Sequence, residues 1–102
     1  MALLTQSFFM PHFVYILQSL KDGKYYVGET FNVEARLHFH NAGLQRSTKH
    51  RCPFKIVLIE AYPDRILALK REKEIKSWKG GIQFKKLIEG SGPASRDTTF
   101  GT

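Results

Sequence analysis

The pattern of apolar and polar positions divides the chain into short strands and helices. Residues 13–17 are all aromatic or aliphatic, and residues 25–27 resume this character after an Asp-Gly pair, which is typical of a β-hairpin. A third apolar run, residues 54–62, is nearly continuous and rich in β-branched side chains, which predicts a strand at the centre of a sheet.

Two longer helices and one short helix are expected around these strands. Asn32 is a favourable N-cap, and Gly43 stands just past the end of a helix of about three turns. A second helix begins around Asp64 and extends to about Trp78, and a short helix follows over residues 82–88. The order β, β, α, β, α, α predicts an α+β fold in which helices pack against a small sheet.

The expected elements form a single domain of the 102-residue chain. We assign residues 13–89 to this domain, residues 1–12 to an N-terminal extension and residues 90–102 to a flexible tail rich in Gly, Ser and Pro. Met10 stands directly before the first strand and is a candidate alternative start. Because the extension lacks a basic segment and polar residues interrupt its apolar run, we expect neither a signal peptide nor a membrane helix. The single cysteine fits a reducing cytoplasm.

The register of the hairpin decides which of its tyrosines share a face. If the connection has an even number of residues, one register places Tyr15 opposite Thr30. Tyr15 then shares a face with Tyr26 and Gly28, while Tyr25 points the other way. A three-residue loop with a bulge would exchange the two neighbouring tyrosines. Taken one at a time, all three phenols could be ordinary strand aromatics.

The chain is strongly basic, with 16 Lys and Arg against 9 Asp and Glu and a net charge of +7. The excess is densest over residues 36–55 and 65–86, so we expect a polyanionic partner, nucleic acid rather than a membrane surface. A charge excess that only keeps the protein soluble is the alternative. The basic side chains expected to contact phosphates are Arg46, Lys49, His50, Arg51, Lys73 and Lys76.

The first predicted helix carries two basic residues on its apolar side. At 100° per residue, Arg36 and His40 fall inside the stripe formed by Val33, Leu37 and Phe39. A single residue of this kind is usually a snorkelling arginine or a hydrogen-bonded, partly buried histidine. Two of them, four residues apart and therefore side by side, indicate a site that requires a cation near the sheet.

Glu72 is the candidate metal ligand of the second predicted helix. It lies at the edge of the apolar arc and is surrounded in sequence by lysines and arginines. Most such glutamates are solvated ion-pair partners. A lone carboxylate beside a basic groove could instead hold Mg²⁺ or Mn²⁺ together with water and substrate phosphate. Spacing alone leaves both interpretations open.

Two tripeptides add a more specific signal. “VYI” at residues 14–16 and “YVG” at residues 26–28 stand ahead of the helix arginine, with ten residues between their tyrosines. This combination resembles the GIY-YIG endonuclease family over about residues 13–89. The similarity is closest to its small single-domain bacterial members, related to the N-terminal nuclease domain of the excinuclease C subunit. Five positions follow in the order that the family has: Tyr15, Tyr26, Arg36, His40 and Glu72.

The resemblance implies a central three-stranded antiparallel sheet flanked by helices, and hydrolysis of a phosphodiester bond with one divalent ion, Mg²⁺ or Mn²⁺. In that scheme Tyr15 and Tyr26 lie near the attacking water, and one of them orients or deprotonates it. Arg36 faces the scissile phosphate, His40 supports water or phosphate, and Glu72 carries the metal. Because Arg36 and a metal ion both favour phenolate, we expect this grouping to make a tyrosine useful as a base.

Departures from the family pattern keep more than one function open. Glu29 stands where some relatives have lysine, and residues 82–88 lack the asparagine of many active members, for which Gln83 is a candidate replacement. The first function is a metal-dependent endonuclease acting on DNA rather than RNA, with specificity that comes from nucleic-acid structure or from a protein partner. The second is a non-catalytic or weakly catalytic DNA- or RNA-binding module using the same basic face. A protein-interaction domain built on the aromatic hairpin is the third, and it predicts no salt-dependent nucleic-acid binding.

Overall fold

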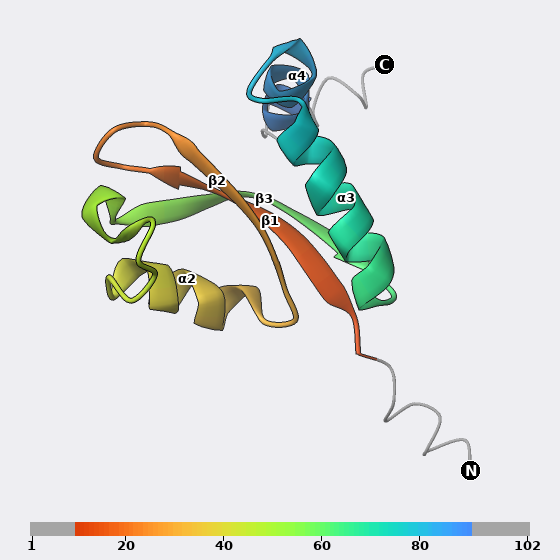
Figure 1. Ribbon diagram of the computed structural model, residues 1–102, viewed down its shortest axis with the longest axis horizontal. Coiled ribbons are helices and arrows are strands. Elements are labelled where there is room, and N and C mark those ends of the chain that lie inside the picture. Colours follow the sequence, from red (N-terminus) through yellow and green to blue (C-terminus); the bar gives the residue numbers. More distant parts are fainter. Residues whose placement is uncertain (1–9, 91–102) are drawn as a thin grey trace, which may run out of the picture.

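The computed structural model describes residues 10–90 and contains one sheet with helices on both faces (Figure 1). Helix α2 covers one face, α3 covers the other, and α4 follows at the end of α3. The elements are β1 (His12–Ser19), β2 (Tyr25–Thr30), α2 (Val33–Asn41), the short 3-10 helix η1 (Lys49–Arg51), β3 (Phe54–Tyr62), α3 (Arg65–Ser77) and α4 (Ile82–Gly90). The predicted α+β class and the order of the elements are confirmed.

The outer limits of these elements lie close to the domain range expected from the sequence. Strand β1 begins at His12 and helix α4 ends at Gly90, so each passes the range 13–89 by one residue. The remainder of the expected extension and tail, residues 1–9 and 91–102, lies outside the described residues. No helix within residues 10–90 has the length and apolar character needed to cross a membrane.

The three strands form an antiparallel sheet in the order β2-β1-β3, with β1 in the centre. The prediction that residues 54–62 form a central strand is therefore wrong, because β3 is an edge strand. Its apolar run reflects coverage on both faces. Leu58 packs on the α3 side and Phe54 on the α2 side, while Ile59 remains 48% exposed.

The hairpin of β1 and β2 pairs Tyr15 with Gly28 and not with Thr30. Its connection, residues 20–23, is even in length and is closed by the backbone N–H of Ser19, which donates to the carbonyl of Lys24 at 2.8 Å. The expected register is thus wrong by two positions, because β1 continues to Ser19 before the chain turns. Since side chains alternate with a period of two, a shift of two positions leaves every face assignment unchanged.

The predicted faces of the tyrosines are confirmed. Tyr15 and Tyr26 both belong to the cluster under α2, with ring centroids 6.3 Å apart. Tyr25 points to the opposite side of the sheet, where its ring meets Phe84 of α4 edge to face at 5.1 Å. The hairpin therefore gives two phenols to one face and one phenol to the other.

Side-chain caps begin both longer helices at the expected residues. The Asn32 carboxamide oxygen accepts a hydrogen bond from the N–H of Ala35 at 3.0 Å, and Asp64 accepts one from the N–H of Leu67 at 2.9 Å. After α2 the chain turns through Gly43, whose φ of +75° suits glycine. These caps orient α2 and α3 against opposite faces of the sheet.

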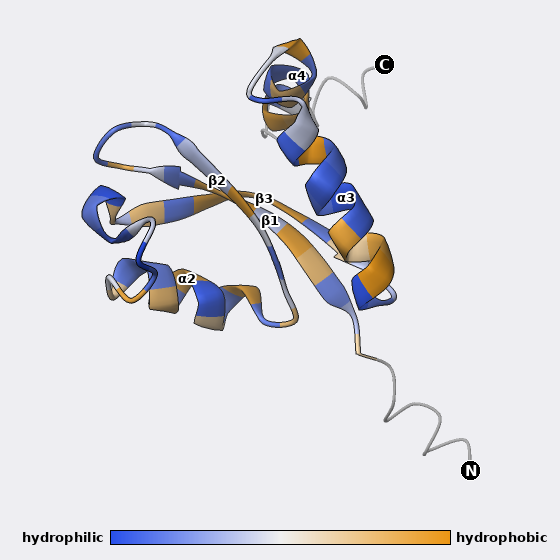
Figure 2. Ribbon diagram, viewed as in Figure 1, coloured by the Kyte–Doolittle hydropathy of each residue, from blue (hydrophilic) through white to orange (hydrophobic). Residues whose placement is uncertain are grey.

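The core consists of two clusters separated by β1, and Figure 2 shows apolar residues along the strands between α2 and α3. Val14 and Ile16 point toward α3 and α4, where they meet Ala68, Ile75 and Phe84. On the α2 side the buried members are Tyr15, Leu17, Val33 and Phe54. One strand thus supplies the centre of both clusters, because successive side chains alternate between its faces.

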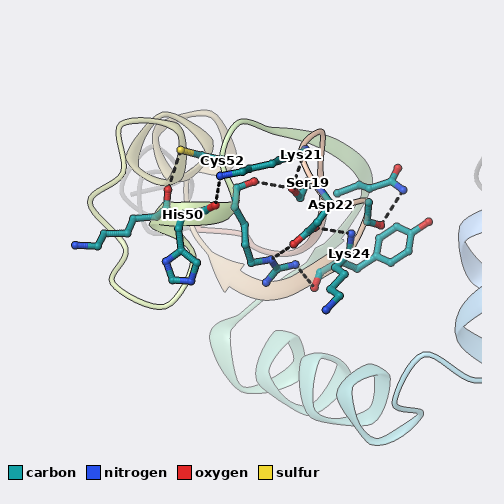
Figure 3. A network of polar contacts seen from close by, with 11 residues as sticks. Ser19, Lys21, Asp22, Lys24, His50 and Cys52 are labelled. Atoms are coloured by element: carbon teal, nitrogen blue, oxygen red, sulfur yellow. Dashed lines mark hydrogen bonds and ion pairs between the residues drawn. The ribbon is translucent and has the colours of Figure 1, made fainter.

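The tip of the hairpin is attached to the segment that precedes β3 (Figure 3). The hydroxyl of Ser19 donates to the carbonyl of Arg51 at 2.5 Å, and the ammonium of Lys21 donates to the carbonyl of His50 at 3.1 Å. Arg51 also pairs with Asp22 at 3.3 Å. These contacts hold residues 19–24 against η1 and position the loop that connects α2 to β3.

Candidate active site

Tyr15 crosses strand β2 at the one position where the partner residue has no side chain. A Cβ atom at Gly28 would lie 2.5 Å from the hydroxyl oxygen of Tyr15 and 2.6 Å from its Cζ atom, well inside van der Waals contact. The phenol is almost completely buried as a result. The glycine of “YVG” therefore has a steric role, because it lets the first tyrosine of the motif lie across the second strand.

His40 of α2 links this phenol to the loop before η1. Its imidazole is fully buried, with Nε2 at 3.3 Å from the Tyr15 hydroxyl and Nδ1 at 3.0 Å from the Thr48 hydroxyl. Thr48 donates its own proton to the carbonyl of Gln45, at 3.4 Å, and so accepts from Nδ1–H. That leaves Nε2 as the acceptor for the Tyr15 hydroxyl. The result is a buried chain of hydrogen bonds from Tyr15 through His40 to Thr48.

Burial keeps this imidazole neutral. Removal from water, together with the nearby positive charge of Arg36, lowers the pKa of His40 from 6.5 to about 4. A neutral ring at pH 7 matches the tautomer assigned from the hydrogen bonds. The ring also packs against that of Tyr26, with centroids 4.7 Å apart and planes tilted by 59°. His40 therefore joins both phenols of this face.

Arg36 lies half-buried on the same face of α2. Its guanidinium donates to the side-chain oxygen of Gln45 at 3.2 Å and lies 4.4 Å from the centre of the Phe39 ring. A hydrogen bond from Arg36 also lowers the pKa of Tyr15. The helix stripe inferred from the sequence thus brings Arg36 and His40 beside Tyr15 and Tyr26.

The net effect on Tyr15 is opposite to the expectation that cations would favour phenolate. Burial is the largest influence and raises the pKa of Tyr15 to about 12, against the lowering by Arg36. The charges of Tyr26 and Glu72 contribute to this higher pKa. Arg36 acts in the expected direction, but desolvation outweighs it. Tyr15 is therefore a neutral phenol at pH 7, able to donate a proton to His40 and to accept one at its oxygen.

Glu72 approaches this phenol from the other helix. Its side chain on α3 is 17% exposed and pairs with Lys76 at 2.8 Å, one turn further along. The ion pair proposed as the ordinary fate of this glutamate is thus present. Its carboxylate is nevertheless close enough to influence the pKa of Tyr15, so it belongs to the same electrostatic environment.

The acidic side chains present suit only one kind of metal site. Within residues 10–90 no group of three or more His, Cys, Asp or Glu side chains is placed to hold an ion. A protein cage for zinc or calcium is therefore not formed by the described residues. A single accessible carboxylate such as Glu72 does fit Mg²⁺ or Mn²⁺, which bind through one or two carboxylates and take their other ligands from water and substrate phosphate.

The basic residues expected to contact phosphates fall into two groups. Arg46, Lys49 and His50 are exposed on the loop and η1, and Lys73 and Lys76 are exposed on α3. Arg51 differs from them, because its guanidinium donates to Asp22 at 3.3 Å and to the carbonyl of Tyr25 at 3.4 Å. Arg51 thus has a role in holding the hairpin, whatever else it contacts.

Glu29, which departs from the family pattern, is paired within the chain. Its carboxylate contacts the His12 imidazole and lies 3.7 Å from Arg65. Together with Arg36 these residues line a pocket of about 350 Å³ beside the end of β2. Neither a free carboxylate facing phosphate nor a metal ligand shared with Glu72 is needed to explain this position.

Thr48 and Gln45 are the members of this site that sequence reasoning did not find. Both belong to a polar loop with no regular period, and their contacts arise because the loop folds back on α2. A local pattern cannot reveal a contact of that kind. The useful signal was indirect, since a fully buried histidine needs a partner for each ring nitrogen.

Comparison with known proteins identifies the family of this chain. Residues 11–86 match the GIY-YIG catalytic domain. A UPF0213 protein of Staphylococcus haemolyticus is 40% identical over 79 residues, which cover 76% of this chain and 95% of the relative. A UPF0213 protein of Haloquadratum walsbyi is 43% identical over 68 residues, which cover 66% of this chain and 75% of the relative.

A solved structure shares the fold. The solution NMR structure of a UPF0213 protein from Bacillus halodurans aligns with a TM-score of 0.51 and 33% sequence identity, over 91% of this chain and 99% of that one. The family match includes both tripeptides, α2 and the whole of α3. The chain therefore belongs to the GIY-YIG catalytic domain family.

Proposed function

We propose that the protein is a metal-dependent endonuclease that hydrolyses phosphodiester bonds, in DNA rather than RNA and by structure rather than sequence. The observation that carries this proposal is the buried chain Tyr15–His40–Thr48, which ends in a phenol beside Arg36 and within the influence of Glu72. Structural packing alone would be served by apolar residues at these positions, since burying polar groups costs free energy unless all of them are paired. Specificity then comes from nucleic-acid shape or from a protein partner.

The chain's own residues supply a route for the proton of the attacking water. As the water oxygen bonds to phosphorus and the bond to the leaving oxygen breaks, the Tyr15 oxygen accepts the water proton. Its own proton passes to Nε2 of His40 along the hydrogen bond of 3.3 Å. The phenol stays neutral throughout, which agrees with a raised pKa. In this scheme Tyr26, whose ring packs against His40 with centroids 4.7 Å apart, orients the water.

Arg36 links substrate binding to this transfer. Its charge disfavours protonation of His40 in the free protein, and a phosphate bound to the guanidinium offsets that charge. Proton acceptance by His40 thus becomes more favourable when substrate is present. The same guanidinium stabilises negative charge that grows on the phosphate in the transition state. A Mg²⁺ or Mn²⁺ ion held by Glu72 would polarise the phosphate and stabilise the leaving oxygen.

A second function is favoured by one observation. The carboxylate of Glu72 is paired with Lys76, and an ammonium in that position competes with a metal ion. If the pair persists with substrate, the chain is a non-catalytic or weakly catalytic DNA- or RNA-binding module with the same basic face. Both functions predict salt-dependent binding, so only cleavage separates them.

The test measures cleavage of end-labelled single-stranded, nicked and forked DNA, and of structured RNA, with Mg²⁺ or Mn²⁺. We expect Tyr26→Phe and Glu72→Gln to lose cleavage while they retain binding. Two matched controls should retain both: Tyr25→Phe, the neighbouring phenol on the other face, and Glu74→Gln, an exposed carboxylate of α3 that pairs with Arg71 at 2.9 Å.

Three results would decide against the enzyme. Residual cleavage equal in the wild type and all four variants would identify a contaminant. Salt-dependent binding with no metal-dependent cleavage of any substrate would favour the binding module. Absence of salt-dependent binding would instead favour the protein-interaction domain.

A further inference from the structure

A groove of about 520 Å³ lies between strand β2 and the junction of α3 with α4, next to the candidate active site. Its lining includes the aromatic residues Tyr25, Tyr26 and Phe84. Aliphatic residues of β2 and α3 complete the apolar wall. None of the catalytic roles proposed above requires this space. Its chemistry can therefore be considered separately.

The apolar wall of the groove is suited to a flat ring. Tyr25 and Phe84 meet edge to face at 5.1 Å, and Tyr25 keeps 38% of its surface exposed to solvent. Exposed aromatic surface of this kind is a stacking platform for nucleobases, which bind aromatic side chains through their π faces without regard to sequence.

The rim of the groove is suited to phosphate. Lys24, Lys76 and Lys79 line it from the hairpin, from α3 and from the turn after α3, and all three are exposed. Among the described residues that line the groove there is no carboxylate. Three cations around an aromatic wall match the composition of a nucleotide, an anionic backbone joined to an aromatic base.

The groove is continuous with the candidate active site through two residues. Tyr26 of the edge strand β2 belongs to the groove lining, while its ring packs on the α2 side against His40, with centroids 4.7 Å apart. Lys76 lines the rim and pairs with Glu72 at 2.8 Å. A strand whose phosphate lies at the site would therefore have the adjoining nucleotide beside the groove.

We propose that this groove binds an unpaired nucleobase of the substrate strand, stacked on Tyr25, whose ring is supported from below by the buried Phe84, with the flanking phosphates on the lysine rim. The proposal rests on the proposed function only in taking nucleic acid as the ligand. A base held in a duplex cannot enter the groove without being unpaired and unstacked, which costs a few kcal/mol. The groove thus selects single-stranded, nicked or forked substrates and explains structural preference without base-specific contacts.

The test measures the affinity of the full-length protein for two short oligonucleotides by fluorescence anisotropy in EDTA. One is oligothymidylate and the other is an abasic oligomer of the same length and charge. We expect the wild type to bind the thymidylate at least about tenfold more tightly, since one stacked base contributes roughly a factor of ten or more. Tyr25→Thr should reduce this ratio to near one, because it removes the ring and keeps a residue suited to a strand.

A matched control is available on the same side of the molecule as the candidate site. Phe31 is a 64% exposed aromatic residue outside the groove, so Phe31→Thr should leave the ratio unchanged. Lys24→Gln should weaken binding of both oligonucleotides more than Lys55→Gln does, because only the first lysine lies on the rim. If Tyr25→Thr does not fold by circular dichroism, Tyr25→Val, which is also suited to a strand, replaces it with the same expected loss of the ratio.

Three outcomes would overturn the groove assignment. The first is equal affinity of the wild type for oligothymidylate and the abasic oligomer. The second is an equal loss of this affinity ratio in Tyr25→Thr and Phe31→Thr. The third is equal affinity of the wild type for oligothymidylate and a blunt duplex. Because the measurement contains no metal and no cleavage, it is independent of the nuclease proposal. If the wild type prefers oligothymidylate but does not cleave in Mg²⁺, the result supports base binding in the groove and contradicts the nuclease proposal. If it cleaves but shows no such preference, the nuclease proposal is supported and base binding in the groove is contradicted.

Discussion

The two faces of β1 show how one strand serves two different purposes. On the α3 side, Val14 and Ile16 enter a cluster made entirely of apolar side chains. On the α2 side, the same strand presents Tyr15 to a buried histidine, which in turn contacts a buried threonine. The first face stabilises the fold through burial alone, and the second uses hydrogen bonds that must all be satisfied.

This difference has an energetic consequence. Within residues 10–90 no buried side-chain nitrogen or oxygen lacks a hydrogen-bond partner, so the polar face is fully paired. A paired polar network adds little net stability, but removing one partner leaves another group buried and unsatisfied. We therefore expect truncation of the buried apolar residues on the α3 side to affect stability without affecting the chemistry, and mutations in the polar network on the α2 side to affect both.

The largest effect on stability is expected from Ile75→Ala on the apolar face. Ile75 is almost fully buried under β1, so its truncation should lower the free energy of unfolding by about 2–5 kcal/mol in urea titration. Any cleavage by the folded fraction should change little. A loss of cleavage larger than the loss of folded protein would show that the two faces are coupled.

A pH dependence of similar size should come from His40 on the polar face. Its pKa is about 4 in the folded protein and near 6.5 when unfolded, so the unfolded chain binds more protons between these values. The free energy of unfolding should therefore fall by roughly 3 kcal/mol as pH decreases from 6.5 to 4. Urea titrations at several pH values in this range should show that the free energy of unfolding of His40→Gln depends less steeply on pH. The same pH dependence of stability in wild type and variant would show that His40 is not its source.

Gly28→Ala should have an intermediate effect, because the new methyl group would overlap the phenol of Tyr15. Overpacking at such a site typically costs about 1–3 kcal/mol, and displacement of the phenol should reduce cleavage by more than about tenfold. Gly90→Ala is the matched control, since no atom lies within 4 Å of its Cβ position. Normal cleavage in Gly28→Ala would show that Tyr15 takes no part in the reaction.

The smallest effect is expected from Thr48→Val, which removes the hydroxyl that accepts from Nδ1 of His40. One unsatisfied buried donor costs about 1–2 kcal/mol, and the tautomer of the ring is no longer selected. We expect the pH profile of cleavage to shift and Thr48→Ser to restore it. If Thr48→Val and Thr48→Ser have the same pH profile of cleavage, the hydroxyl of Thr48 does not act on His40 and the residue only fills space.

Sequence reasoning succeeded where the signal is local or periodic. Asn32 and Asp64 begin their helices as N-caps because capping depends on residues within one turn. The helical period placed Arg36 and His40 on the sheet side, and the strand period placed Tyr15 and Tyr26 on one face even with an incorrect register. Each of these predictions depends only on spacing along the chain.

Sequence reasoning failed where the outcome depends on the assembled fold. The apolar run of β3 indicates that side chains on both its faces pack against other residues, but it does not indicate whether the strand is central or at the edge of the sheet. The contact of Thr48 depends on how a loop returns to α2, and the balance of burial against Arg36 at Tyr15 depends on depth in the structure. No local spacing contains this information.

The attachment of the hairpin tip to the segment before β3 limits how the length of that segment can change during evolution. Surface loops generally accept insertions and deletions. Here Thr48 contacts His40, and three positions later the carbonyl of Arg51 accepts a hydrogen bond from Ser19. One residue more or fewer between them would withdraw one of these contacts. Variation in length is therefore excluded from this interval, although it lies on the surface and outside the sheet.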